Sequence, residues 1–317
     1  MRIAVTGATG FLGGHLVDRL LGDGHSVIAF ARRPDAAAML AKKGAEIVLG
    51  DLTAAIDLPK QSRAEAFIHA AALSSNWGPR AAFLAANVGG TRRALELARA
   101  MGVRRFVHIS SPSIYFRFAD QLGVREDAPL ARPVNAYAES KGLAEALVLA
   151  ARDLNPLILR PRGIYGRGDV ALLPRLIRAA ARGPLPLLRG GQAVTDLTHV
   201  DDAVSAVLAA LDAPVSVGAL AVNISGGEAL PIVKIVEGAC GRVGVRPHWR
   251  RMPFGLALAG SRVAETIAAV LPGRPEPIVT MYSLGVLAYS QTLDISRAAA
   301  VLGWRPQIGF EAGLAML

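Results

Sequence analysis

Short apolar runs alternate with Ala-rich or amphipathic segments along the first half of this 317-residue chain. The runs contain β-branched residues and predict strands at residues 2–6, 26–30, 46–49, 66–69, 105–109 and 156–159. The segments between them predict helices most clearly at residues 11–21, 79–101 and 134–152. Strands that alternate with helices in this way pair in parallel, with helices on both faces of one sheet. The sequence therefore predicts an α/β fold with a doubly wound parallel sheet over residues 1–165.

The pattern loosens after residue 165 into a stretch rich in Pro and Gly. We expect residues 166–317 to form a smaller C-terminal lobe that closes over the carboxyl edge of the sheet. A predicted strand at residues 219–224 returns to the sheet, so the boundary is not a clean cut in the sequence. The helices predicted for the lobe are at residues 200–211, 231–242 and 294–302.

Three glycines with the spacing G-x-x-G-x-x-G follow the first predicted strand and open the first predicted helix: Gly7, Gly10 and Gly13. In this position a glycine-rich turn brings backbone N–H groups and a helix N-terminus to a pyrophosphate. The pattern alone fits a structural turn equally well, but its place between strand and helix favours a dinucleotide site. The cofactor-binding residues of this turn would be Gly7, Thr9, Gly10, Phe11, Leu12 and Gly13.

A tyrosine and a lysine lie four residues apart in the sequence NAYAESK, as Tyr137 and Lys141. At this spacing the two side chains share one helix face, so the ammonium can favour the ionised phenol. A free tyrosine, with a pKa of about 10, is a poor base at neutral pH. Together with the glycine turn, the pair predicts redox chemistry on a bound nicotinamide dinucleotide.

The end of the second predicted strand bears on the choice of cofactor. An acidic residue there would bind the adenosine ribose and repel a 2′-phosphate. None is present, and Arg32 and Arg33 come next. Because a guanidinium binds phosphate bidentately, we favour NADP over NAD; the alternative is that both arginines point into solvent. Asp51 either accepts from the adenine amino group or is an ordinary turn residue.

Composition excludes several classes of protein. The formal net charge is +10, but the cations are scattered and aromatic residues make up only 5% of the chain. We therefore expect no nucleic-acid partner, because such proteins cluster cations and interleave aromatic residues. Cys240 is the single cysteine, which excludes an intramolecular disulfide and fits a small buried hydrophobe in a reducing, cytoplasmic compartment.

The longest apolar stretch, residues 254–271, is interrupted by glycine, serine and charged residues. We expect neither a transmembrane helix nor a secretory signal. Three alternatives remain for this stretch: the wall of a lipid-sized pocket, a face that rests on a membrane surface, or ordinary core or dimer packing.

The chain resembles the extended short-chain dehydrogenase/reductases, the superfamily that also contains nucleotide-sugar epimerases and dehydratases. The resemblance spans nearly the whole chain. Within the superfamily, NWG at residues 76–78 and LGWRP at residues 302–306 are similar to the branch of 3β-hydroxysteroid dehydrogenase-like enzymes and 2-alkyl-3-oxoalkanoate reductases. The motifs that carry the resemblance are TGATGFLG (6–13), GDL (50–52), HAAA (69–72), NVGGT (87–91), SSPS (110–113), YAESK (137–141), RPRGIYG (160–166) and HVDD (199–202).

The resemblance implies a Rossmann fold, a homodimer through the helices at residues 79–101 and 134–152, and a set of site residues. Ser111 would hold the substrate oxygen opposite Tyr137, whereas Ser110 would face away. The further cofactor-binding residues would be Arg32, Arg33, Asp51, Leu52, Ala70, Ala71, Ala72, Asn87, Tyr137, Lys141, Pro161 and Ile164. Substrate contacts would come from Ser74, Trp77, Ser113, Arg162 and Gly163.

We expect no metal site. His199 precedes Asp201 and Asp202, but no second histidine has a suitable spacing, and we expect the aspartates to cap the N-terminus of the following helix. His69 and His108 lie in predicted strands, where we expect them to be packed.

The predicted reaction interconverts a ketone and a secondary alcohol on a small apolar substrate, such as a 3-oxo acid or a 3-ketosteroid. Ser111, Tyr137 and Lys141 would be catalytic, and residues 166–317 would hold the substrate. One alternative is a nucleotide-sugar epimerase or dehydratase with tightly bound NAD. Such enzymes usually carry Asn at the position of Gly163 and often Arg at that of Thr195. A second alternative is a dinucleotide sensor without catalysis, which would need none of the three catalytic residues.

Overall fold

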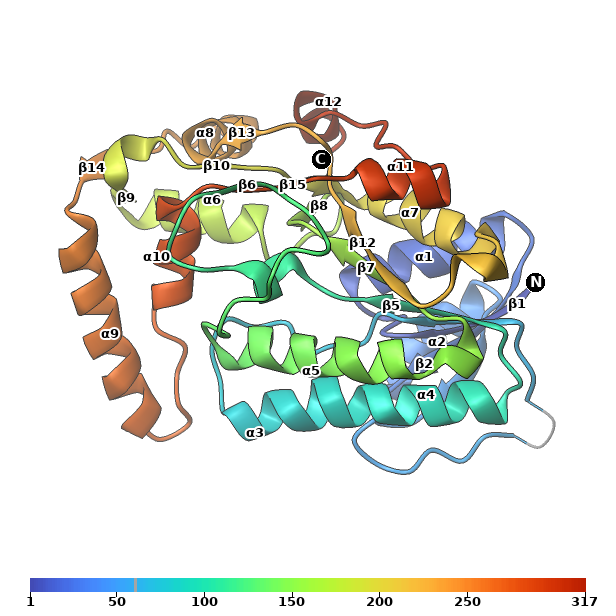
Figure 1. Ribbon diagram of the computed structural model, residues 1–317. Coiled ribbons are helices and arrows are strands. Elements are labelled where there is room, and N and C mark those ends of the chain that lie inside the picture. Colours follow the sequence, from blue (N-terminus) through green and yellow to red (C-terminus); the bar gives the residue numbers. More distant parts are fainter. Residues whose placement is uncertain (60–61) are drawn as a thin grey trace.

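A seven-stranded parallel sheet forms the centre of the computed structural model, which describes residues 1–59 and 62–317 (Figure 1). Its strand order is β12-β7-β5-β4-β1-β2-β3. The order reverses between β1 and β4, which creates the switch point where ligands bind in doubly wound sheets. The strands are β1 (Arg2–Thr6), β2 (Ser26–Ala31), β3 (Glu46–Leu49), β4 (Ala66–His69), β5 (Arg105–Ile109), β7 (Leu157–Pro161) and β12 (Leu220–Ile224).

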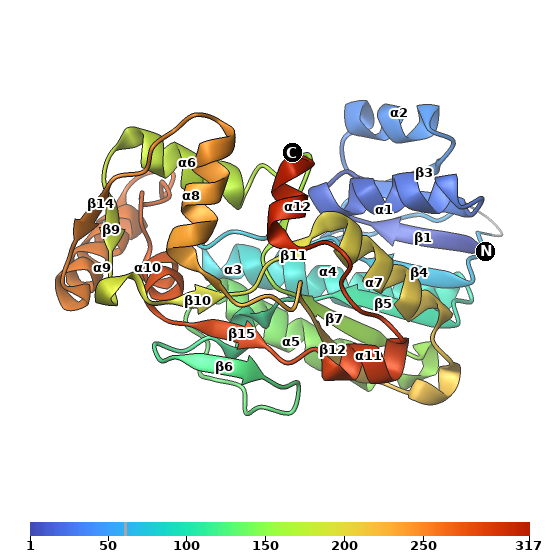
Figure 2. The same cartoon turned by 90° about the horizontal axis from the view of Figure 1, so that it is seen from above.

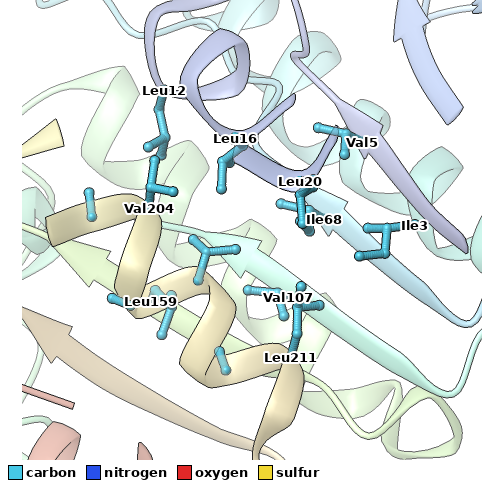
Figure 3. Close-up of a cluster of buried hydrophobic side chains, with 14 of the residues drawn as sticks. Ile3, Val5, Leu12, Leu16, Leu20, Ile68, Val107, Leu159, Val204 and Leu211 are labelled. Atoms are coloured by element: carbon cyan, nitrogen blue, oxygen red, sulfur yellow. The ribbon is translucent and has the colours of Figure 1, made fainter. Parts of the chain in front are cut away.

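These strands confirm the predicted α/β fold, including the return strand, since β12 pairs in parallel with β7. Side chains alternate between two apolar layers because successive residues of a strand point to opposite faces. Ile3 and Val5 belong to one layer, and Ala4 to the other. Figure 3 shows the first layer, in which Leu16 and Leu20 of α1 (Phe11–Gly22) meet side chains from the strands.

The helix predicted at residues 200–211 was wrongly placed in the smaller lobe. It forms α7 (Val200–Asp212), and its Val204 and Leu211 are buried in the same layer as Leu16 of α1 (Figure 3). The reason is its apolar face, which packs against the sheet like any crossover helix. The division of the chain into residues 1–165 and 166–317 stays a prediction.

The other face of the sheet is covered by α4 (Gly90–Ala100) and α5 (Ala136–Ala150), which lie side by side below it in Figure 1. The predicted helix at residues 79–101 is not regular. It begins as α3 (Arg80–Phe83), widens into a π-helical turn over Leu84–Gly89, and continues as α4. Such turns often mark functional positions. A dimer through these helices stays a prediction.

A group of helices gathers beyond the carboxyl edge of the sheet, at the end away from the N-terminus (Figure 2). A four-stranded sheet with the order β13-β10-β15-β6 joins them, and Cys240 is buried among their apolar side chains, as expected. No helix within the described residues has the length and apolar character needed to cross a membrane. The helices are α6 (Leu173–Arg182), α8 (Ile232–Arg242), α9 (Phe254–Val270), α10 (Met281–Ala288) and α12 (Phe310–Ala315).

The shorter elements complete the chain: α2 (Pro34–Lys42), β6 (Gln121–Val124), β8 (Ile164–Tyr165), β9 (Leu185–Leu187), β10 (Val194–Thr195), β11 (Thr198–His199), β13 (Leu230–Pro231), β14 (Trp249–Arg251), β15 (Gln291–Leu293) and α11 (Ser296–Leu302), with 3₁₀ turns at Pro112–Tyr115, Arg152–Leu154, Arg189–Gly191 and Val215–Val217.

Candidate active site

The glycine turn after β1 is too tight for side chains. Gly7 has φ of +69°, and a Cβ there would lie 2.6 Å from the backbone nitrogen of Ala71. A Cβ on Gly13 would lie 1.9 Å from the carbonyl oxygen of Gly7. Gly10 is the N-cap of α1, and no described side chain caps this helix N-terminus. A pyrophosphate could therefore approach the backbone of this turn closely. It could also accept hydrogen bonds from N–H groups that no described side chain occupies.

A hydrogen-bonded chain fixes the loop after β4 against this turn. The Thr6 hydroxyl lies 2.7 Å from Nδ1 of His69, whose Nε2 lies 3.0 Å from the hydroxyl of Thr91. The backbone N–H of Ala71 donates to the Thr6 hydroxyl. Burial, and next the charge of Lys141, lower the pKa of His69 to about 3, so the ring is neutral. His69 is thus packed in its strand, as predicted, and places residues 70–72 beside Gly7.

Ser111 and Tyr137 come together from β5 and α5. Ser111 follows β5 and caps a 3₁₀ turn, where its hydroxyl accepts from the backbone N–H of Ser113. Tyr137 is the second residue of α5, whose N-terminus is capped by Asn135. Burial raises the pKa of Tyr137 to about 12, and hydrogen bonding by Ser111 acts in the opposite direction. The site therefore holds a protonated phenol beside a serine hydroxyl.

Lys141 does not pair with the Tyr137 phenol in the described structure, although the two residues share α5. Its ammonium donates to the carbonyl oxygen of Ile109 at 2.7 Å and lies 3.3 Å from Nε2 of His108. The helix spacing placed the two side chains on one face, but the buried carbonyl at the end of β5 attracts the ammonium instead. Burial lowers the pKa of Lys141 to about 8.

His108 is packed in β5 as predicted, and it stacks on His69 with ring centroids 5.1 Å apart. Burial, followed by the charge of Lys141, holds its pKa well below the usual value. A neutral ring can accept a hydrogen bond from the lysine. His108 therefore supports the position of Lys141.

Three aromatic residues at the site were missed by the sequence analysis. Tyr282 of α10 lies near the Tyr137 phenol, and it packs edge-on against Phe116 with ring centroids 5.2 Å apart. Phe83 packs edge-on against Tyr137 with ring centroids 6.4 Å apart. No local signal marks these residues, because each joins the site only through tertiary packing. They give the surroundings of the Tyr137 phenol an aromatic, apolar character.

Asn87 is buried in the π-helical turn and acts as a clamp. Its side-chain oxygen accepts from the backbone N–H of Leu73, and its amide donates to Leu73 and to the Ser140 hydroxyl. These bonds join the loop after β4 to α5. The side-chain amide of Asn87 is thus bonded within the protein. Asn87 would therefore act on a cofactor through the loop after β4, which it fixes in place.

The predicted substrate residues are divided between the site and its surroundings. Ser113 is buried and its hydroxyl has no partner within the described residues. Trp77 donates from Nε1 to the carbonyl oxygen of Arg274, which connects the loop after β4 to the segment between α9 and α10. Ser74 lies exposed in the same loop.

Arg162 is buried and bonded within the protein. It donates to the Thr195 hydroxyl and to the side-chain oxygen of Gln291, and it lies 4.0 Å from the Asp196 carboxylate. Burial raises the pKa of Asp196. Gly163, next to Arg162, has φ of +50°. These bonds fix the Arg162 side chain in the wall behind the site, and its contact with a substrate stays a prediction.

Arg32 and Arg33 lie at the adenosine end of the switch point, with side chains that are each 75% exposed. Arg32 lies 3.6 Å from Asp51, and Arg33 lies 3.6 Å from Asp35. Asp51 accepts from the backbone N–H and the hydroxyl of Thr53, and the first of these bonds contributes most to its lowered pKa. Asp51 therefore forms a turn and lies near Arg32, and its contact with an adenine amino group stays a prediction.

The remaining cofactor candidates line the same edge of the sheet. Pro161 ends β7, and Ile164 begins β8. Leu52 packs near α4, since a Cβ on Gly90 would lie 3.5 Å from the Cβ of Leu52. Thr9 is exposed at the tip of the glycine turn, whereas Phe11 and Leu12 begin α1.

The prediction that the aspartates after His199 cap α7 is wrong. The cap is the His199 ring, which accepts from the backbone N–H of Asp201. Asp202 instead accepts from the backbone N–H groups of Gln307 and Ile308 and so binds the C-terminal segment. A capping side chain must lie before the first turn, and both aspartates lie within it. Among the described residues, no group of three or more His, Cys, Asp or Glu could hold a metal ion.

A doubly wound sheet with a glycine turn at its switch point defines a dinucleotide-binding protein. The sequence profile of the NAD dependent epimerase/dehydratase family matches residues 3–225, and the chain belongs to this family. It is an NAD-dependent enzyme of the short-chain dehydrogenase/reductase type.

Two curated relatives and one solved structure illustrate the similarity. A 2-alkyl-3-oxoalkanoate reductase of Stenotrophomonas maltophilia (strain K279a) is 33% identical, over 100% of this chain and 98% of the relative. A ceramide reductase of Caulobacter vibrioides (strain NA1000 / CB15N) is 36% identical, over 82% of this chain and 77% of the relative. The solved structure of MoeE5 in complex with UDP-glucose and NAD is 28% identical, covers 100% of this chain and 97% of that chain, and superposes with a TM-score of 0.76. The resemblance stated from the motifs is confirmed.

Proposed function

We propose that this protein interconverts a ketone and a secondary alcohol on a small apolar substrate. The observation that carries the proposal is the position of the Tyr137 phenol, which lies beside Ser111 and near Phe83 and Tyr282, with Phe116 packed against Tyr282. Aromatic walls favour an apolar molecule, and the two hydroxyls suit a carbonyl oxygen. Two relatives, a 2-alkyl-3-oxoalkanoate reductase and a ceramide reductase, carry names of the same kind. The single, buried thiol fits a cytoplasmic location.

Different residues of the chain would bind the carbonyl oxygen and transfer the proton. A nicotinamide cofactor would supply the hydride for reduction, or accept it in the reverse direction. Ser111 would donate a hydrogen bond to the carbonyl oxygen, and Tyr137 would give that oxygen its proton as the carbon gains the hydride. Such proton donation by a positioned side chain is general acid catalysis. The Lys141 ammonium would favour loss of the phenol's proton once it turns toward the site.

A nucleotide-sugar epimerase or dehydratase is the second candidate, and the likeness to MoeE5 with UDP-glucose supports it. Two positions argue against it. A Cβ on Gly163 would lie 2.7 Å from a side-chain carbon of Leu197, so an asparagine would not fit there without movement. Position 195 holds a threonine in place of the nucleotide-binding arginine, and this threonine is buried and bonded to Arg162.

The deciding experiment follows the loss of NADPH or NADH by absorbance with 3-oxo fatty acids and 3-ketosteroids. With UDP-sugars it follows the products by chromatography, because epimerisation consumes no net cofactor. We expect turnover of an apolar ketone and none of the UDP-sugars. Conversion of a UDP-sugar with retained NAD, and no ketone turnover, would assign the chain to the epimerases instead. Equal binding of cofactor by wild type and Tyr137→Phe, with no turnover of any substrate by either, would favour a sensor.

Cofactor preference provides a separate prediction. We propose NADP as the preferred cofactor, because Arg32 and Arg33 are exposed at the adenosine end and neither Phe30 nor Ala31 is acidic. Replacing Arg32 by alanine should raise KM for NADPH about tenfold and leave KM for NADH nearly unchanged, since a charge-assisted hydrogen bond contributes ~1.5–3 kcal/mol. Arg33→Ala is the matched comparison at equal exposure. Equal KM values for both cofactors in the wild type would contradict the preference for NADP.

The pH dependence of ketone reduction should follow the ionisation of Lys141. Burial lowers its pKa to about 8, so the ammonium is charged below this pH and neutral above it. The Tyr137 phenol, with a pKa of about 12, stays protonated over this range. We therefore expect kcat/KM for ketone reduction to fall as the pH rises through about 8, because this ratio reports the ionisations of the free enzyme. A flat profile between pH 7 and pH 9 would show that the charge of Lys141 does not assist the reaction.

A further inference from the structure

One side of α9 carries an apolar stripe that faces away from the protein. Leu256, Val263, Ile267 and Val270 are 71%, 59%, 53% and 80% exposed. With Gly260 they follow a spacing of four, three, four and three residues, which places them along one helix face. We refer to these five residues as the α9 stripe.

The opposite side of α9 holds the helix to the lobe. Ser261 and Ala268 are buried, and Phe254 and Ala257 pack against Leu284 of α10. Figure 1 shows α9 at the margin of the molecule, with α10 on its inner side. The apolar stretch is therefore neither a buried core helix nor wholly the wall of a pocket, and its stripe has no partner within the described residues.

Most of the charged side chains around the stripe are arginines without an ion-pair partner among the described residues. Arg250 and Arg251 of β14, Arg262 of α9 and Arg274 after it are exposed, and none forms an ion pair with any described residue. Both acidic residues of the segment are occupied: Glu276 pairs with Arg175, and Glu265 accepts from the backbone N–H of Met281. The surface thus combines exposed aliphatic side chains with free guanidinium groups.

We propose that the α9 stripe and its arginines dock the protein on the surface of a bilayer that contains anionic lipid. Interfacial helices combine an apolar face that enters the acyl boundary with cations that meet the headgroups. A second copy of this chain fits less well, because a symmetric contact through the stripe would bring two sets of unpaired arginines together. The charges favour a lipid surface over a self-interface.

Docking in this orientation would place the candidate active site near the bilayer. The carbonyl of Arg274 binds Trp77, and α10, which packs on α9, carries Tyr282 next to Tyr137. An apolar ketone dissolved in the membrane would then enter without crossing bulk water. This part of the inference rests on the proposed function, whereas membrane binding itself does not.

The test measures co-sedimentation of the full chain with vesicles of phosphatidylcholine alone and of phosphatidylcholine mixed with phosphatidylglycerol, with neither cofactor nor substrate present. We expect binding to the mixed vesicles that weakens as salt is added. Arg262→Glu should weaken this binding about thirtyfold, the equivalent of ~2 kcal/mol for a change of two charges at the surface. Val263→Asp and Ile267→Asp should each abolish it.

Met39→Asp is the matched control, because Met39 is 66% exposed on α2, at the other end of the molecule from α9 (Figure 2). It should bind vesicles like the wild type. Equal binding by Val263→Asp and the wild type would overturn the proposal. So would a wild-type dimer in sedimentation velocity that becomes monomeric in Val263→Asp, with no vesicle binding by either protein. Turnover of a short, water-soluble ketone should be unchanged in Val263→Asp, so loss of docking and failure of the proposed function remain distinguishable.

Discussion

Tyr137→Phe is expected to lower kcat for ketone reduction by about 10²- to 10⁴-fold, the usual contribution of a positioned proton donor. The substitution removes only the hydroxyl that lies beside Ser111 and keeps the ring that packs on Phe83. Cofactor affinity should therefore change little, because the glycine turn and the loop after β4 are untouched. Steady-state kinetics, together with a fluorescence titration of NADPH, measure the two effects separately.

Tyr282→Phe is the matched control for this experiment. Tyr282 lies near the Tyr137 phenol and packs against Phe116, so both tyrosines belong to the same aromatic surroundings. We expect kcat to fall by less than about tenfold, since Tyr282 has no serine partner among the described residues and acts only as a wall of the site. A larger loss of kcat in Tyr282→Phe than in Tyr137→Phe would contradict our assignment of the proton transfer to Tyr137.

The parts of the fold that the sequence predicts well are those with local causes. The strand, glycine turn and helix at residues 2–21 form from neighbouring residues, and each β-branched run before residue 160 becomes a strand of the main sheet. The return strand could be predicted because its apolar run matches the others. In contrast, α7 has an ordinary apolar face, and only the three-dimensional packing decides that this face meets α1.

The site shows the same division. Tyr137, Lys141 and Ser111 could be found by spacing and resemblance, yet the direction of the Lys141 ammonium depends on the carbonyl of Ile109. Tyr282 lies far along the chain from Tyr137 and joins it only because α10 packs against the loop that contains Phe116. The burial of Arg162 likewise requires Thr195 and Gln291, which come from two other segments. Contacts between distant segments leave no pattern in a single sequence.

Gly13→Ala should disable the glycine turn. The added Cβ would lie 1.9 Å from the carbonyl oxygen of Gly7, and this neighbour is backbone, which cannot rotate away as a side chain can. Either α1 must shift away from β1 or the turn must open, and overpacking of this kind destabilises by ~1–3 kcal/mol or more. We expect a lower midpoint of thermal unfolding and at least about a hundredfold weaker binding of NADPH, because the N–H groups at the helix N-terminus no longer lie where the pyrophosphate needs them.

Gly14→Ala separates this steric effect from any general effect of alanine in α1. The nearest atom to a Cβ on Gly14, outside the neighbours that the helix itself provides, is the carbonyl oxygen of Ala8 at 3.9 Å, an ordinary contact. Alanine also favours the helix over glycine by ~1 kcal/mol, so Gly14→Ala should unfold at the same or a higher temperature and bind NADPH normally. Equal loss of binding in both variants would mean that α1 tolerates no added methyl group at all. Only a defect confined to Gly13→Ala shows that the close approach of Gly13 to Gly7 builds the nucleotide site.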